Sequence, residues 1–123
     1  AECKNPMMDP LDVTALQALS RQDSTYGAVG VLHDGPDLQA WWIWKDHEEV
    51  EPTESVMDHD DLLFVVRGTL RLELEDRDPV IVRAGELFVI PAGTPFRGYR
   101  WPRDGEPCLF LAVTAAGATF TRR

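Results

Sequence analysis

The chain has 123 residues, of which 44% are hydrophobic and 27% charged, values that are ordinary for a globular protein. A chain of this length fits one domain with a single core. Twelve basic and 21 acidic residues give a formal net charge of −9, which would repel phosphate backbones and anionic lipid headgroups. We therefore expect neither nucleic acid nor a membrane surface as a partner.

The N-terminal part of the sequence predicts a tail followed by one short helix. We expect residues 1–8 to be a flexible tail, which could be a remnant of expression, and residues 9–123 to form the single domain. Asp9 and Pro10 are the residue types favoured at the N-cap and at the first helical position, and they predict a helix from about Pro10 to Ser20.

The two cysteines, Cys3 and Cys108, form no Cys-x-x-Cys motif. We predict two unpaired thiols in a reducing compartment, and so a cytoplasmic protein. No apolar run approaches the length of a membrane span.

The rest of the chain predicts short β-strands separated by turns. Leu70, Leu72 and Leu74 alternate with charged residues, which is the period of a half-buried strand. About eight strands at such short spacing predict a sandwich or barrel and argue against alternating strands and helices. The other predicted strands span 26–32, 38–45, 62–66, 80–83, 87–90, 96–101 and 108–114, with further strand propensity at 119–121.

A tryptophan-rich strand and an acidic segment are the two unusual stretches. Trp41, Trp42 and Trp44 put indoles on both faces of one strand, either as core and interface packing or as a stacking surface for a ligand. A shift of one residue in register would reverse which of them face inward. The segment 46–61 carries eight carboxylates and two histidines and is expected to be a loop, or a loop with a short strand.

His59 lies two positions before Asp61, so the two side chains would share one face of an extended strand. In a dry pocket such a pair could act as an oriented general base. The alternative is that His59 lies in solvent beside Asp58 and Asp60 and has no catalytic role.

Fixed glycines and a proline give the sequence a family resemblance. Gly85, Pro91 and Gly93 match the first three positions of G-x5-P-x-G-x2-H-x3-N, and the spacing from Asp61 to Gly68 matches the end of a first motif, E-x6-G. Over roughly residues 38–113 the chain resembles the cupin family, whose members are small jelly-roll-like β-barrels. The resemblance implies an all-β, cupin-like jelly-roll β-barrel with a short N-terminal helix, and it suggests a homodimer built through edge strands.

The same resemblance bears on metal binding. In metal-dependent cupins three histidines and a glutamate hold a divalent transition metal, but here Phe96 and Arg100 stand where the second motif has histidine and asparagine. The family's His-x-His falls either on Ser55 and Met57 or on Glu54 and Val56, so neither alignment supplies a histidine. Carboxylates alone hold transition metals weakly, and we predict no metal and no cofactor.

These observations predict a metal-independent cupin that binds a small organic molecule in its barrel. The expected pocket walls are Met57, Phe96, Asp61 and one or more of the strand tryptophans, among which we favour Trp42 and Trp44, with Arg100 presenting its guanidinium to a polar ligand. His59 and Asp61 are the candidate catalytic residues.

Whether the protein is an enzyme stays open. It could be a binding protein or a cofactor-free isomerase, cyclase or dehydratase. One alternative is a metal-dependent, dioxygenase-type cupin with a degenerate site of His59, Asp61 and Glu54. The other is a non-catalytic dimerising or interaction module that uses the tryptophan-rich strand and the helix.

Overall fold

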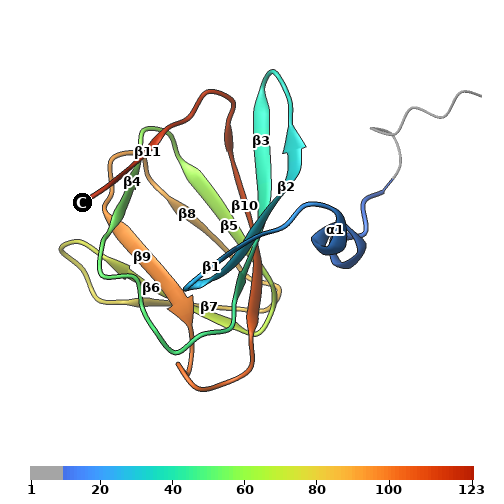
Figure 1. Ribbon diagram of the computed structural model, residues 1–123. Coiled ribbons are helices and arrows are strands. Elements are labelled where there is room, and N and C mark those ends of the chain that lie inside the picture. The colour runs from blue at the N-terminus through green and yellow to red at the C-terminus, as the bar shows by residue number, and fades with distance from the viewer. Residues whose placement is uncertain (1–9) are drawn as a thin grey trace, which may run out of the picture.

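The computed structural model describes residues 10–123, which form two antiparallel β-sheets that face one another (Figure 1). The six-stranded sheet has the order β1 (Gln22–Ser24), β2 (Gly27–Asp34), β3 (Leu38–Lys45), β10 (Cys108–Ala115), β5 (Asp61–Arg67), β8 (Leu87–Ile90). The five-stranded sheet has the order β11 (Phe120–Arg122), β4 (Ser55–Met57), β9 (Phe96–Arg100), β6 (Thr69–Leu74), β7 (Val80–Arg83).

This architecture confirms the predicted all-β jelly-roll fold. Across residues 10–123 the two sheets share no strand, so this jelly roll is a sandwich with open edges and not a closed barrel. The acidic segment contributes β4, the short strand that the sequence left open as an alternative to a loop. No helix within residues 10–123 has the length and apolar character needed to cross a membrane.

The main core lies between the sheets and is built by strand alternation. The predicted alternation in β6 is confirmed, since Leu70, Leu72 and Leu74 are buried and Arg71 and Glu73 between them are only partly so. Burying such side chains is the dominant favourable contribution to the stability of the sandwich. The buried residues of this cluster are Leu63, Val65, Leu70, Leu72, Leu74, Val82, Ile90, Cys108, Phe110 and Ala112.

The glycines of the sequence motifs occupy turns that require them. Gly68, Gly85 and Gly93 have φ values of 75°, 86° and 81°, in the left-handed region that disfavours other residues. At Gly68 a Cβ atom would also overlap the backbone oxygen of Pro107. These backbone conformations explain why the motifs have glycine at these positions.

Helix α1 (Val13–Leu19) begins three residues later than predicted. The Oδ1 atom of Asp12 accepts hydrogen bonds from the backbone N–H groups of Thr14 and Ala15, at 3.0 and 3.2 Å, so Asp12 is the N-cap. The predicted N-cap Asp9 and the predicted tail at residues 1–8 lie outside the described residues. Asp12 lies three positions after Asp9 and is the same residue type, so the sequence contains two candidate N-caps for this helix.

A second apolar cluster lies on the outer face of the larger sheet, on the side where α1 stands in Figure 1. Trp42 is fully buried there with Ala28 and Leu109, and Val13 of α1 packs against them. Gly30 is the cross-strand partner of Trp42. A Cβ atom on Gly30 would overlap both the Trp42 indole and the backbone oxygen of Ser20. The indole therefore packs directly against the strand backbone at Gly30, where there is no side chain.

Candidate functional site: a cavity between the sheets

A cavity of about 760 Å³ lies between the two sheets. Alternate residues of β3 form part of its wall, namely Gln39, Trp41, Ile43 and Lys45, because successive side chains of a strand point to opposite faces. The exposed lining residues lie on β1 and β11, which are the edge strands of the two sheets. The cavity therefore opens to solvent between these two edges.

Asp61 is the buried acidic group of this cavity. It is the first residue of β5 and is only 6% exposed, and its Oδ1 atom has no hydrogen-bond partner among the described residues. Burial raises the pKa of the Asp61 carboxyl to about 6. A carboxyl group with a free oxygen and a pKa near neutrality can both give and accept a proton.

Four positions of the family motifs meet at the cavity. Ser55, Met57, Asp61 and Phe96 all line it, and Ser55 is the cross-strand partner of Phe96. The structure thereby chooses between the two alignments of the His-x-His motif: the positions are Ser55 and Met57, on alternate residues of β4.

The side chains at these positions do not fit a transition metal. They offer one carboxylate, one hydroxyl, one thioether and an apolar ring, where such a metal needs several nitrogen, sulfur or carboxylate ligands. The described part of the chain contains no group of three or more His, Cys, Asp or Glu side chains that could hold a metal ion. The degenerate metal site of His59, Asp61 and Glu54 is not assembled.

His59 is not brought together with Asp61. It is exposed, and its Nδ1 atom lies 2.9 Å from Oδ1 of Asp58. Asp58 also accepts hydrogen bonds from the backbone N–H and the hydroxyl of Thr119, at 2.8 and 2.9 Å. These bonds lower the pKa of Asp58 to about 2, with the contact from His59 contributing most. Alternation along a strand predicted that His59 and Asp61 share a face, but β5 begins only at Asp61, so His59 lies outside the strand.

The tryptophans of β3 divide between two environments. Trp41 lines the cavity, whereas Trp42 and Trp44 belong to the cluster beneath α1 on the outer face. We favoured Trp42 and Trp44 as pocket residues, whereas the structure places the neighbouring Trp41 on the cavity wall. Of the other expected wall residues, Met57, Phe96 and Asp61 do line the cavity.

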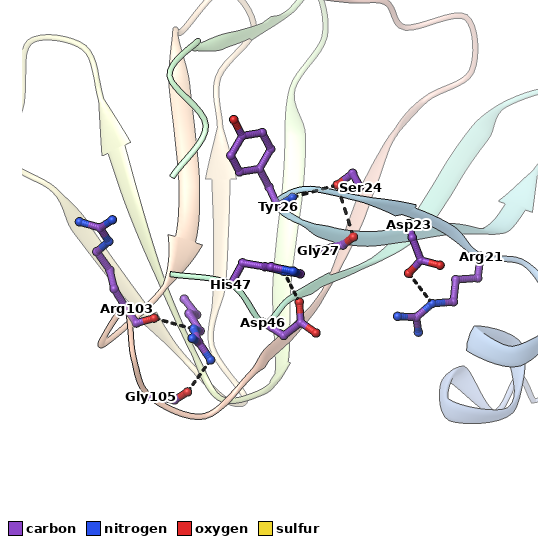
Figure 2. Close-up of polar contacts among 10 residues, drawn as sticks. Arg21, Asp23, Ser24, Tyr26, Gly27, Asp46, His47, Arg103 and Gly105 are labelled. Carbon is purple, nitrogen blue, oxygen red and sulfur yellow. Dashed lines mark hydrogen bonds and ion pairs between the residues drawn. The ribbon is translucent and has the colours of Figure 1, made fainter. Parts of the chain in front are cut away.

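Arg100 does not line the cavity either. Its Nε and Nη1 atoms donate hydrogen bonds to the backbone oxygens of Arg103 and Gly105, both at 2.7 Å, and Figure 2 shows these two acceptors. The guanidinium group expected to bind a ligand instead shapes the loop after β9.

Polar groups surround the mouth of the cavity. The Ser24 hydroxyl donates to the Gly27 oxygen and accepts from the Tyr26 backbone N–H, both at 3.3 Å, which holds the turn between β1 and β2 (Figure 2). From the opposite edge, Glu51 and Arg122 form an ion pair at 2.9 Å. A ligand that enters between the edge strands passes these groups before it reaches the apolar interior.

Lys45 is a cavity residue that the sequence reasoning missed. It is half-buried, and burial is the main cause that lowers the pKa of its amine. The signal was available, because Lys45 is an even number of positions from Trp41 and Ile43 and so shares their face of the strand.

The family model described as "Cupin domain" matches residues 45–114, more than half of the chain. The chain belongs to the cupin family. A search of curated proteins found no match.

Solved structures repeat the cupin fold at low sequence identity. KdgF from a Halomonas species is 23% identical with a TM-score of 0.65, over 79% of this chain and 87% of that one. A conserved protein with a double-stranded β-helix domain from Klebsiella pneumoniae is 17% identical with a TM-score of 0.74, over 92% and 95% of the two chains.

The formate complex of the oxalate decarboxylase of Lactobacillus farciminis is 15% identical with a TM-score of 0.72, over 86% of this chain but 34% of that one. At such identities these likenesses show the cupin fold alone.

Proposed function

We propose that this cupin binds a small organic molecule with an apolar or aromatic body in the cavity between its sheets, and that Asp61 exchanges a proton with it. The observation that carries the proposal is the unpartnered carboxyl of Asp61 on the wall of a cavity of about 760 Å³. Ligand pockets in proteins have volumes of roughly 300–1,000 Å³ and combine apolar walls with a few polar groups.

The chemistry that suits one such carboxyl is proton transfer. A general acid or base works best when its pKa lies near the working pH, and positioned proton transfer accelerates reactions by roughly 10²–10⁴-fold. We therefore place the reaction among isomerisations, cyclisations or dehydrations in which Asp61 moves a proton on the bound molecule. A donor set that does not fit a transition metal supports this choice over a dioxygenase-type reaction.

Binding in the cavity is testable with N-phenyl-1-naphthylamine, a fluorescent probe that joins two apolar ring systems through one N–H donor. We expect its fluorescence to rise on titration with the protein and to saturate at one equivalent. Ala112 is buried and lines the cavity, so Ala112→Phe should narrow the space for the probe and weaken its binding. A rise that Ala112→Phe leaves unchanged but that disappears in Leu87→Asp, which alters only the outer face, would contradict the proposal.

We further propose a homodimer formed through the outer face of β10, β5 and β8. Leu62 pairs with Val89 and Phe64 with Leu87, so apolar side chains lie side by side across two strands. Leu87 is 54% exposed and Val89 42%, and no described residue covers them, whereas α1 covers the other half of the same face. An apolar face of this kind on an edge strand suits a self-complementary contact with a second copy.

The homodimer predicts a mass of two chains in size-exclusion chromatography with light scattering. Leu87→Asp should give a monomer with the same circular dichroism spectrum, because a charge cannot be buried unpaired in the interface. Leu38→Asp is the matched control, since Leu38 is 53% exposed on β3, a strand of the same sheet outside the proposed interface. A monomeric wild-type protein would refute the dimer.

A cytoplasmic location, suggested by the free buried thiol of Cys108, remains part of the proposal.

A further inference from the structure

Lys45 places a primary amine in the same cavity as Asp61. It is the last residue of β3, where its side chain shares the inward face with Trp41 and Ile43. Its cross-strand neighbour is Cys108 of β10. The amine thus lies at the end of an apolar wall and next to the mouth residues Glu51 and Arg122, which also line the cavity.

The amine has no partner that would hold it as a fixed cation. Among the described residues, no carboxylate oxygen lies within 4.0 Å of its Nζ atom, and the mouth carboxylate of Glu51 is bound instead to Arg122 at 2.9 Å. Most amines on a protein surface are protonated and solvated, and they react slowly for that reason. An amine that lacks a partner and lies beside apolar side chains is a candidate nucleophile.

The charged groups near Lys45 do not offset the effect of burial on the pKa of its amine. Burial lowers the pKa of the amine most strongly, Glu51 raises it, and the Arg122 cation lowers it again. Cys108 supplies no anion at neutral pH, because burial raises the pKa of its thiol to about 12. The balance leaves a larger share of uncharged amine at neutral pH than an ordinary lysine has.

We propose that Lys45 is a carbonyl-reactive residue, whose amine forms an imine with an aldehyde or ketone that enters the cavity. The lone pair of the nitrogen attacks the carbonyl carbon, a C–N bond forms as the C=O π bond breaks, and one proton passes from the nitrogen to the oxygen. The resulting carbinolamine loses this oxygen and the second N–H proton as water, and the C=N bond replaces the C=O bond without any oxidation or reduction. The inference rests on the proposed function, because the carbonyl compound must enter the same cavity.

The composition of the chain makes this inference unusually easy to test. The sequence contains only two lysines, Lys4 and Lys45, so a modified amine can be assigned by peptide mass mapping. Benzaldehyde is a suitable compound because its ring can lie against the apolar wall, and sodium borohydride reduces an imine to a stable benzyl-amine. Nα-acetyl-lysine amide, a lysine derivative in which only the ε-amine is free, is added to the same reaction as the reference amine.

At pH 7 we expect Lys45 to be benzylated faster than the reference amine, because burial lowers the pKa of its amine and leaves more of it uncharged. Ala112→Phe should slow the benzylation of Lys45, because the added ring narrows the cavity. Lys45→Arg keeps the charge and should lose the adduct.

The outcomes separate this inference from the proposed function. Benzylation of Lys45 at or below the reference rate, in a protein that still binds N-phenyl-1-naphthylamine, would overturn the imine and leave the binding cavity in place. Fast benzylation that Ala112→Phe does not slow would also overturn it, because the aldehyde would then reach Lys45 from outside the cavity. Loss of both probe binding and benzylation would refute both proposals.

Discussion

Asp61→Asn is expected to make the protein more stable at pH 8, by about 2–3 kcal/mol in the free energy of unfolding. Burial raises the pKa of Asp61 from its ordinary 3.8 to about 6, so the folded state holds this proton more tightly than the unfolded state. The stabilisation from the neutral carboxyl is complete below about pH 4 and is lost as the pH rises through 6. Asparagine keeps the shape of the side chain and avoids burying a charge.

Urea unfolding of both proteins between pH 4.5 and 8 checks this prediction. The difference between wild type and variant should be largest at pH 7–8 and should shrink as the pH falls, because wild-type Asp61 then becomes neutral in the folded state. Asp78→Asn is the control, since Asp78 is exposed and should give no comparable pH dependence. A difference that does not change with pH would mean that Asp61 titrates normally.

The same substitution connects stability with function. A buried charge that costs stability is retained in natural proteins mainly where it is needed for activity. If Asp61 moves a proton on the bound molecule, Asp61→Asn should stabilise the fold and abolish turnover together. A substitution that stabilised the protein and left turnover intact would remove Asp61 from the mechanism.

The second large effect is expected at Trp42. Trp42→Ala should lower the free energy of unfolding by about 3–5 kcal/mol, the usual cost of deleting a buried aromatic side chain. Trp42 has 0% exposure and fills the space between the bare backbone of Gly30 and helix α1. Gly30→Ala should cost about 1–3 kcal/mol at the same contact, because it pushes a methyl group into the indole.

Trp41→Ala is the matched comparison on the same strand. Trp41 is half-buried and lines the cavity, so its loss should reduce affinity for N-phenyl-1-naphthylamine about tenfold and should cost less stability than Trp42→Ala. Urea unfolding and probe titration of both variants separate the two roles. Equal losses of stability, with unchanged probe affinity in Trp41→Ala, would show that the cavity wall has been misassigned.

The fold could be predicted because its signals are local. The alternation in β6 and the turn glycines Gly68, Gly85 and Gly93 depend on the period of a strand and on backbone sterics, both of which are visible in sequence. The family positions Met57, Asp61 and Phe96 could be carried over for the same reason, since fixed spacing from those turns places them on the cavity wall.

The residues placed differently depend on long-range features of the structure. Trp41 cannot be told apart from Trp42 and Trp44 by sequence, because a strand with indoles on both faces gives no local sign of which face meets the cavity. Arg100 is engaged by two backbone oxygens of a loop that comes after it in the chain. The predicted direction of the His59 side chain depends on where β5 begins, and the first residue of a strand is hard to locate from sequence.

Strand β3 leaves little room for mutational change. From Ala40 to Lys45 no side chain is exposed, since one set faces the cavity and the other faces α1 or the neighbouring strands. Inserting or deleting one residue here would exchange the two sets, taking the amine of Lys45 out of the cavity and Trp42 out from beneath the helix. We therefore expect length changes in related sequences to fall in the turns at either end of β3, and the six positions from Ala40 to Lys45 to vary only by substitution.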